Sequence, residues 1–125
     1  MIAFISDHGD LTWEEFMEHY RPKLITALKE NHSFVDGDFI GTDIICQSFL
    51  SPITDKVTVY HMFDKPRNAK YNFSTVGGFQ TDEARDSAMT NASDYDIAWV
   101  RPGRECSGTA DNISRRNNAE LLDKK

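Results

Sequence analysis

The chain has 125 residues, of which 39% are hydrophobic and 27% charged, and these values indicate a single folded domain with its own core. No apolar stretch approaches the length of a membrane span and no secretory signal leads the sequence, so we expect a cytoplasmic protein without a membrane partner. Residues 1–100 carry 8 Lys and Arg against 16 Asp and Glu, which argues against polymeric nucleic acid as a ligand, whereas residues 101–125 carry 6 against 4. A small anionic ligand near the end of the chain fits this distribution better.

Strand and helix signals alternate along the whole chain. In chain order we expect a strand over 1–5, a helix over 13–28, a strand over 34–37, a helix over 41–50, a strand over 57–62, a loop over 63–80, a helix from 81 to about 92, a strand over 97–100 and a helix from 109 to about 122. The long loop has no sustained periodicity, and it is either a functional lid or disordered.

Local signals fix several helix ends. Thr12 and Glu15 have the spacing of a capping box, which opens the first helix. Pro22 lies inside that helical pattern, so we expect the helix to kink or split near Arg21. Pro52 ends the second helix just after residue 50.

The alternation predicts an α/β fold, a Rossmann-like three-layer sandwich with a parallel sheet of at least four strands. We expect the strands at 1–5, 57–62 and 97–100 to be central and buried. Ligands of such sheets bind at the carboxyl ends of the strands, where the strand order reverses. The edges of a small sheet need cover, so a homo-oligomer is also expected.

The segment between the last strand and the last helix has the composition of an anion site. Gly103 and Gly108 allow tight turns and close approach of the backbone, and Thr109 stands at the expected helix N-cap. The unpaired N–H groups of the first helical turn attract negative charge. Arg101 and Arg104 flank the loop and could clamp a phosphate or carboxylate.

Two short motifs resemble the SLOG superfamily of Rossmann-like proteins. Residues 37–43, G-D-F-I-G-T-D, resemble the G-x-x-x-G-x-D signature that opens its second helix, and residues 102–109 resemble its P-G-G-x-G-T loop with extra residues inserted. The superfamily includes the DNA-processing protein A domain and the "lonely guy" phosphoribohydrolases, and nucleoside deoxyribosyltransferases are similar to it. The resemblance spans about residues 1–120 and implies a single nucleotide-binding domain, with the ligand's phosphate at Gly108 and Thr109.

The expected ligand-binding residues come from the turns at the carboxyl edge and from the last helix. They are Ser6, His8, Gly37, Gly41, Asp43, Arg101, Gly103, Arg104, Ser107, Gly108, Thr109 and Asn112. No histidine or cysteine pair has the spacing of metal ligands, so neither a metal nor a cofactor is expected.

Asn112 stands where the resemblance places the catalytic glutamate of the hydrolases and transferases. An amide cannot act as a carboxylate nucleophile or a general base, so we expect a binding protein for a nucleotide-type ligand. The alternative is an N-glycoside hydrolase or transferase acting on a nucleoside monophosphate. Asp7, Asp10 or Asp111 would then supply the carboxylate.

Overall fold

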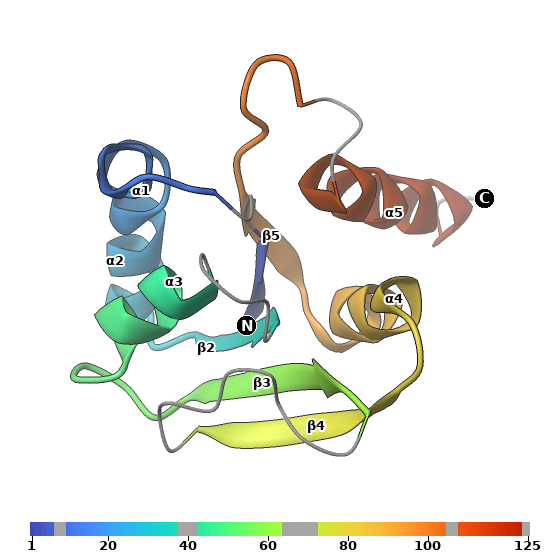
Figure 1. Ribbon diagram of the computed structural model, residues 1–125, viewed down its shortest axis with the longest axis horizontal. Helices are drawn as coiled ribbons and strands as arrows, with labels where there is room; N and C mark the ends of the chain where they lie inside the picture. Colours follow the sequence, from blue (N-terminus) through green and yellow to red (C-terminus); the bar gives the residue numbers. More distant parts are fainter. Residues whose placement is uncertain (7–9, 38–42, 64–72, 105–107, 124–125) are drawn as a thin grey trace.

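The computed structural model describes residues 1–6, 10–37, 43–63, 73–104 and 108–123 (Figure 1). Its elements, in chain order, are β1 (Ile2–Ser6), α1 (Trp13–His19), α2 (Arg21–Lys29), β2 (Ser33–Gly37), α3 (Asp43–Leu50), β3 (Val57–Met62), β4 (Ser74–Phe79), α4 (Asp82–Ala92), β5 (Tyr95–Ala98) and α5 (Gly108–Asp123). No helix in these ranges is both long and apolar enough to cross a membrane.

The strands form one sheet of five, all parallel, in the order β4-β3-β2-β1-β5. This confirms the predicted α/β fold with a Rossmann-like parallel sheet of at least four strands. Figure 1 shows α1, α2 and α3 on one side of the sheet and α4 and α5 on the other. The chain changes sides when α4 carries it from one edge strand, β4, to the other, β5.

The predicted positions of the strands are partly wrong. β1 and β3 each have two neighbouring strands as expected, but the last strand covers Tyr95–Ala98 instead of 97–100 and lies at an edge. Ile97 is its one buried residue. The middle of the sheet is β2, because three successive connections extend the sheet in one direction from β1 to β4 before α4 returns the chain to the other side.

The predicted loop over 63–80 is wrong for its last third, because Ser74–Phe79 forms β4. The strand lacks alternating polarity because it lies at the sheet edge and its residues are mostly exposed on both faces. Its pairing with β3 holds it in the sheet, with Thr58 opposite Ser74 and Met62 opposite Phe79. Residues 64–72 of the predicted loop lie outside the described part of the chain.

The local helix signals are confirmed. The side chain of Thr12 accepts a hydrogen bond from the Glu15 N–H, and the Glu15 carboxylate accepts one from the Thr12 N–H, at 3.1 and 3.0 Å. The first predicted helix splits at Tyr20, between α1 and α2, and Pro22 falls in the first turn of α2, where its missing N–H costs no helical bond.

Two hydrophobic cores of unequal size hold the layers together. The larger one joins one face of the sheet to α1, α2 and α3, and its fully buried side chains include Phe16, Leu24 and Leu50. The smaller one joins Phe4 and Val35 to Met89 of α4. Among the described residues, the second face therefore has less apolar packing than the first.

Gly77 in β4 has a packing role. A Cβ at this position would overlap the imidazole ring of His61, a buried side chain of β3. The ring is held by a 3.1 Å hydrogen bond between Nδ1 and the Met62 carbonyl, so it cannot move away freely. A glycine is therefore required for β4 to pair closely with β3.

We expect Gly77→Ala to lower the free energy of unfolding by about 1–3 kcal/mol, because the added methyl group overpacks the site. In a thermal melt this corresponds to a fall in Tm of roughly 3–10 °C. The matched test is the same substitution in a His61→Ala background, where the ring is absent and the cost should largely disappear. An equal cost in both backgrounds would show that the ring is not the cause.

Candidate functional site

All five carboxyl ends lie at one edge of the sheet because the strands are parallel. The strand order reverses between β1 and β5, the place where ligands bind in open α/β sheets. The segments that follow these two strands, together with the start of α5, surround this point (Figure 1). The candidate site is defined here as Ser6, Asp10, Arg101, Arg104 and Asn112.

A buried polar contact joins β1 to α5 at this point. Asn112 Nδ2 donates a 2.9 Å hydrogen bond to Ser6 Oγ, and both residues are at most 6% exposed. Arg115, one turn later on α5, donates from Nη1 to Asn112 Oδ1 at 2.6 Å. The structure therefore brings together two predicted site residues that are 106 positions apart.

Tyr20 ties the end of β1 to the segment after β5. Its hydroxyl donates to the Ser6 carbonyl at 2.6 Å and accepts from the Trp99 N–H at 3.2 Å, and the side chain is fully buried. The Trp99 ring stacks on His19 with ring centres 3.9 Å apart. Sequence reasoning placed Tyr20 only on the apolar face of a helix. A buried phenol normally finds a hydrogen-bond partner, and that was the available signal.

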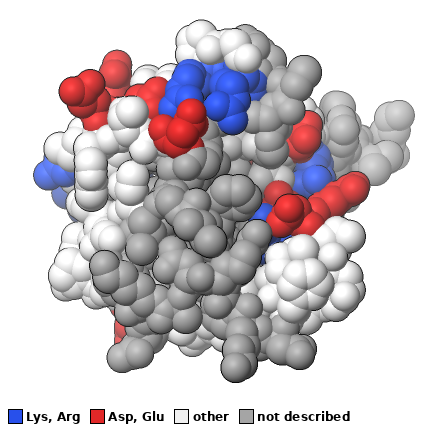
Figure 2. All heavy atoms as spheres, in the orientation of Figure 1, with Lys and Arg blue, Asp and Glu red and all other residues white. Residues whose placement is uncertain are grey.

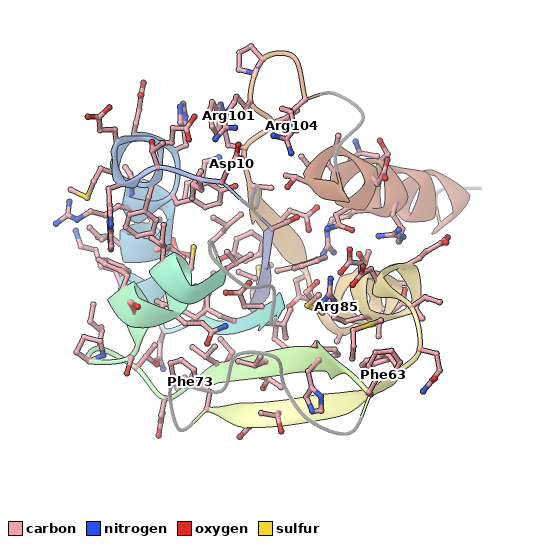
Figure 3. The ribbon with its side chains drawn as sticks, viewed as in Figure 1. Asp10, Phe63, Phe73, Arg85, Arg101 and Arg104 are labelled. Carbon is pink, nitrogen blue, oxygen red and sulfur yellow. The ribbon has the colours of Figure 1, made fainter. Side chains whose placement is uncertain are left out.

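Arg101 binds two carboxylates of the segment that follows β1 (Figure 3). Nε and Nη2 donate to the two oxygens of Glu15 at 2.8 and 2.6 Å, while Nη1 donates to Asp10 Oδ1 at 2.9 Å. Arg104 Nη1 lies farther from Asp10 Oδ1, at 3.5 Å. Figure 2 shows these basic and acidic side chains against one another at the top of the molecule. We call Arg101, Glu15 and Asp10 the arginine clasp.

The arginine clasp changes the acidity of both carboxyl groups. Hydrogen bonds from Arg101, followed by the Thr12 N–H, lower the pKa of Glu15 from 4.5 to about 2. The hydrogen bond from Arg101 also lowers the pKa of Asp10. Both side chains are therefore anionic at neutral pH, and Asp10 cannot serve as a general acid there.

The remaining predicted residues have different positions. Gly37 ends β2, where its carbonyl accepts a 3.1 Å hydrogen bond from Gln47 of α3. Gly103 is exposed and has a φ of +87°, a conformation that favours glycine. Asp43 and Gly108 are the first residues of α3 and α5.

The remaining observations concern α5, the predicted residues outside the described ranges, and metal binding. Thr109 was predicted as the N-cap, but it lies inside the helix and is buried, because α5 begins one residue earlier. Asp111 is exposed on α5. The predicted residues Asp7, His8, Gly41 and Ser107 lie outside the described ranges. Among the residues that the structure describes, no group of three or more His, Cys, Asp or Glu side chains could hold a metal ion.

We expect Tyr20→Phe to lower the free energy of unfolding by about 1–3 kcal/mol, since it leaves the Ser6 carbonyl and the Trp99 N–H without this partner. Urea unfolding measures the loss. Tyr60→Phe is the matched control, because that half-buried hydroxyl makes no hydrogen bond to the described part of the chain. Equal losses in the two variants would contradict the role of the Tyr20 hydroxyl.

The arginine clasp predicts a specific acid sensitivity. Because the pKa of Glu15 in the folded protein lies below its ordinary value of 4.5, its contribution to stability is present above pH 4.5 and is lost as the pH falls toward 2. We expect Glu15→Gln to be less stable than the wild type at pH 7, with a difference that shrinks between pH 4.5 and 2. Glu14→Gln removes the same charge from the same turn and should keep the wild-type pH profile. A constant difference for Glu15→Gln across this range would contradict the effect.

Comparisons with models of protein families, with curated protein sequences and with solved structures found no match to this chain. Its function must therefore be inferred from the geometry of the sheet edge and from the chemistry of the residues gathered there.

Proposed function

We propose that the carboxyl edge between β1 and β5 binds a nucleotide or another small anionic ligand of nucleotide type. The observation that carries this proposal is the strand order, because its reversal coincides with the contact between Ser6 and Asn112. Two elements distant in sequence thus meet through buried polar side chains at the position where this class of fold holds its ligands.

The start of α5 supplies the expected attraction for a phosphate. The helix runs for 16 residues, and the backbone N–H groups of a first helical turn attract negative charge. Together with the helix dipole they favour an anion at this end. Asn112 lies one turn into the helix, so a phosphate at the helix start would place the attached sugar near Asn112 and Ser6.

Of the two arginines, Arg104 is better suited to contact the phosphate. Its side chain is 44% exposed, and its contact with Asp10 is long, at 3.5 Å. Arg101 makes short hydrogen bonds to Glu15 and Asp10, so an anion would have to displace carboxylates that already fit its guanidinium geometry. We assign Arg101 to positioning the loop and Arg104 to the ligand.

Glycoside hydrolysis or transfer is the alternative function, and the available carboxylates support it less well. Asp10 is held by Arg101, which makes it a weak base, and Asp111 is exposed while its neighbour Asn112 is buried against Ser6. The SLOG resemblance, a homo-oligomeric state and a cytoplasmic location stay predictions. The exposed edge strand β4 supports an oligomer because its backbone edge has no further strand to pair with in the described sheet.

The test is calorimetric titration of the protein with a panel of nucleoside monophosphates, combined with chromatography for released base. We expect saturable binding of at least one nucleotide without base release. Arg104→Ala should weaken that binding by about 1–3 kcal/mol, as expected for a lost charge-assisted hydrogen bond. Lys29→Ala removes an exposed charge from a distant helix and should leave the affinity unchanged.

Two results would overturn the proposal. If no nucleotide binds, or if Arg104→Ala and Lys29→Ala both bind like the wild type, the anion site lies elsewhere. Release of free base by the wild type, abolished by Asp10→Ala or Asp111→Ala, would instead establish the glycosidase alternative.

A further inference from the structure

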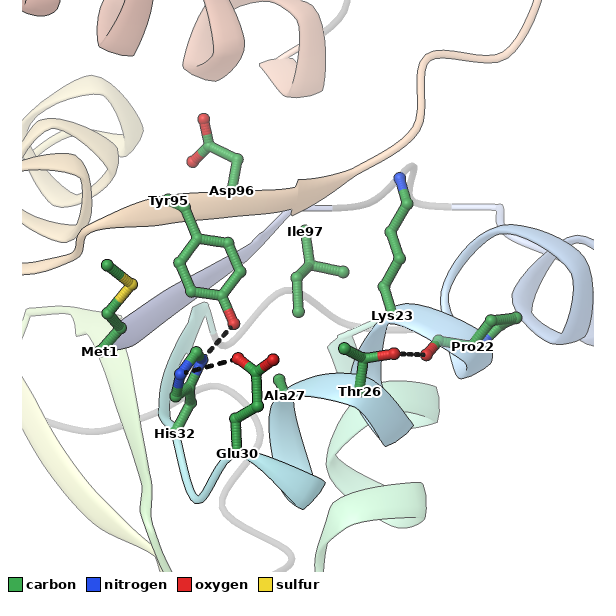
Figure 4. Close-up of a pocket in the computed structure, with 10 residues that line it drawn as sticks. All are labelled: Met1, Pro22, Lys23, Thr26, Ala27, Glu30, His32, Tyr95, Asp96 and Ile97. Carbon is green, nitrogen blue, oxygen red and sulfur yellow. Dashed lines mark hydrogen bonds and ion pairs between the residues drawn. The ribbon is translucent and has the colours of Figure 1, made fainter.

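A pocket of about 540 Å³ lies away from the candidate site, between α2 and the outer edge of β5 (Figure 4). This volume is within the range of small-molecule sites. Its apolar lining includes Ala27 of α2 and Ile97 of β5, which belong to the larger core, and also Pro22. Its charged and polar lining includes Lys23 and Glu30.

The edge strand offers backbone groups along this pocket. The Asp94 N–H donates to the Ile2 carbonyl of β1 at 2.7 Å, so the backbone of Asp94 faces the sheet. Alternate residues of a strand turn their N–H and C=O to the same side, so Asp96 faces β1 as Asp94 does. The N–H and C=O groups of Tyr95 and Ile97 therefore point away from β1. Both residues line the pocket. Ile97 is only 1% exposed, so the backbone of Tyr95 is the part of this edge with which an extended chain in the pocket could pair.

The two ends of the pocket carry opposite charges. The Lys23 ammonium lies at the carboxyl end of β5, where it is 3.4 Å from the Ala98 carbonyl. Glu30 lies at the other end, where its carboxylate is 3.2 Å from Nε2 of His32. Seven residues of helix separate Lys23 from Glu30, which corresponds to about 10 Å. At about 3.3 Å per extended residue, this is the length of a tripeptide.

A hydrogen-bond chain fixes the acidic end. The Tyr95 hydroxyl lies 2.8 Å from His32 Nδ1, and His32 Nε2 faces the Glu30 carboxylate (Figure 4). Burial, followed by the charges of Glu30 and Asp94, raises the pKa of Tyr95, so its hydroxyl keeps its proton at neutral pH. The two ring nitrogens of His32 thus contact the Tyr95 hydroxyl and the Glu30 carboxylate, which holds the carboxylate at the pocket.

We propose that this pocket binds a short free peptide, about three residues long with small apolar side chains, in extended conformation beside β5. Its carboxylate pairs with Lys23 and its ammonium group with Glu30, so the peptide runs parallel to β5. Its backbone bonds to the outward N–H and C=O groups of Tyr95. This site is separate from the nucleotide site and does not depend on it.

The experiment titrates the full chain with the tripeptide Ala-Val-Ala, followed by backbone amide NMR. The same peptide with an amidated C-terminus and with an acetylated N-terminus tests the two charged ends. We expect the free peptide to shift the amide signals of Tyr95 and Ile97, and each blocked peptide to bind at least tenfold more weakly. Lys23→Met should reduce the affinity for the free peptide to that for the amide, with no effect on the amide itself. Lys29→Met is the control on the same helix and should bind like the wild type.

Three results would overturn the proposal. The first is the absence of saturable binding of Ala-Val-Ala to the wild type. Thermal melts of the wild type and Lys23→Met show that both proteins are folded. The second is a Lys23→Met variant that still binds the free peptide at least tenfold more tightly than the amidated one. The third is an acetylated peptide that binds as tightly as the free one, which removes the role of Glu30. Loss of nucleotide binding at the candidate site affects none of these readouts.

Discussion

The position of β5 beside β1 is the constraint on which the rest of the structure depends. The chain builds β1 to β4 in one direction and then returns across the sheet through α4 to add β5 at the opposite edge. Right-handed crossovers in opposite directions place helices on opposite faces, so this single return covers the second face of the sheet. It also separates the loops after β1 and β5, and thereby creates the point at which a ligand can enter.

The two faces of the sheet are stabilised differently. The face under α1, α2 and α3 has an extensive apolar core, whereas the described side chains that dock α5 are mainly polar. Nε of Arg116 pairs with Asp96 of β5 at 3.0 Å, its Nη1 donates to the Ser93 carbonyl at 3.1 Å, and both charged side chains are nearly buried. Removing one partner of such a pair leaves the other charge buried without compensation, so the position of α5 is set by specific polar geometry. Among the described side chains, the helix that carries Asn112 is therefore oriented mainly by hydrogen bonds and ion pairs.

The arginine clasp shows how the chain uses charge for its own structure at the edge where a ligand is proposed. Arg101 joins the segment after β5 to the start of α1. The Glu15 carboxylate accepts hydrogen bonds both from the Thr12 N–H at the helix start and from the Arg101 guanidinium group. A bidentate contact of this kind restricts geometry as well as adding energy. The loop that leads to α5 is thus anchored at Arg101, while Arg104 remains more exposed and farther from its acidic neighbour.

The sequence by itself determined the features that depend on neighbours along the chain. The capping box of Thr12 and Glu15, the helix split near Pro22 and the alternation that gives a parallel sheet follow from hydrogen bonds and steric limits within a few residues. Contacts between distant elements were decided only by the tertiary structure. The strand β4 was missed because its stability comes from pairing with β3 and from the fit of Gly77 to His61, not from any pattern of its own.

The same limit applies to the candidate site. The sequence predicted Ser6 and Arg101 as site residues from the polar residues and glycines that follow the strands at the carboxyl edge, and Asn112 from the SLOG resemblance. It could not assign partners, since the hydrogen bond of Asn112 to Ser6 and the choice of Arg101 for Glu15 join residues more than 80 positions apart. The edge position of β5, and with it the peptide pocket, likewise depends on the order in which the strands assemble. Local propensity carries no information about that order, because every strand of a parallel sheet has the same backbone geometry.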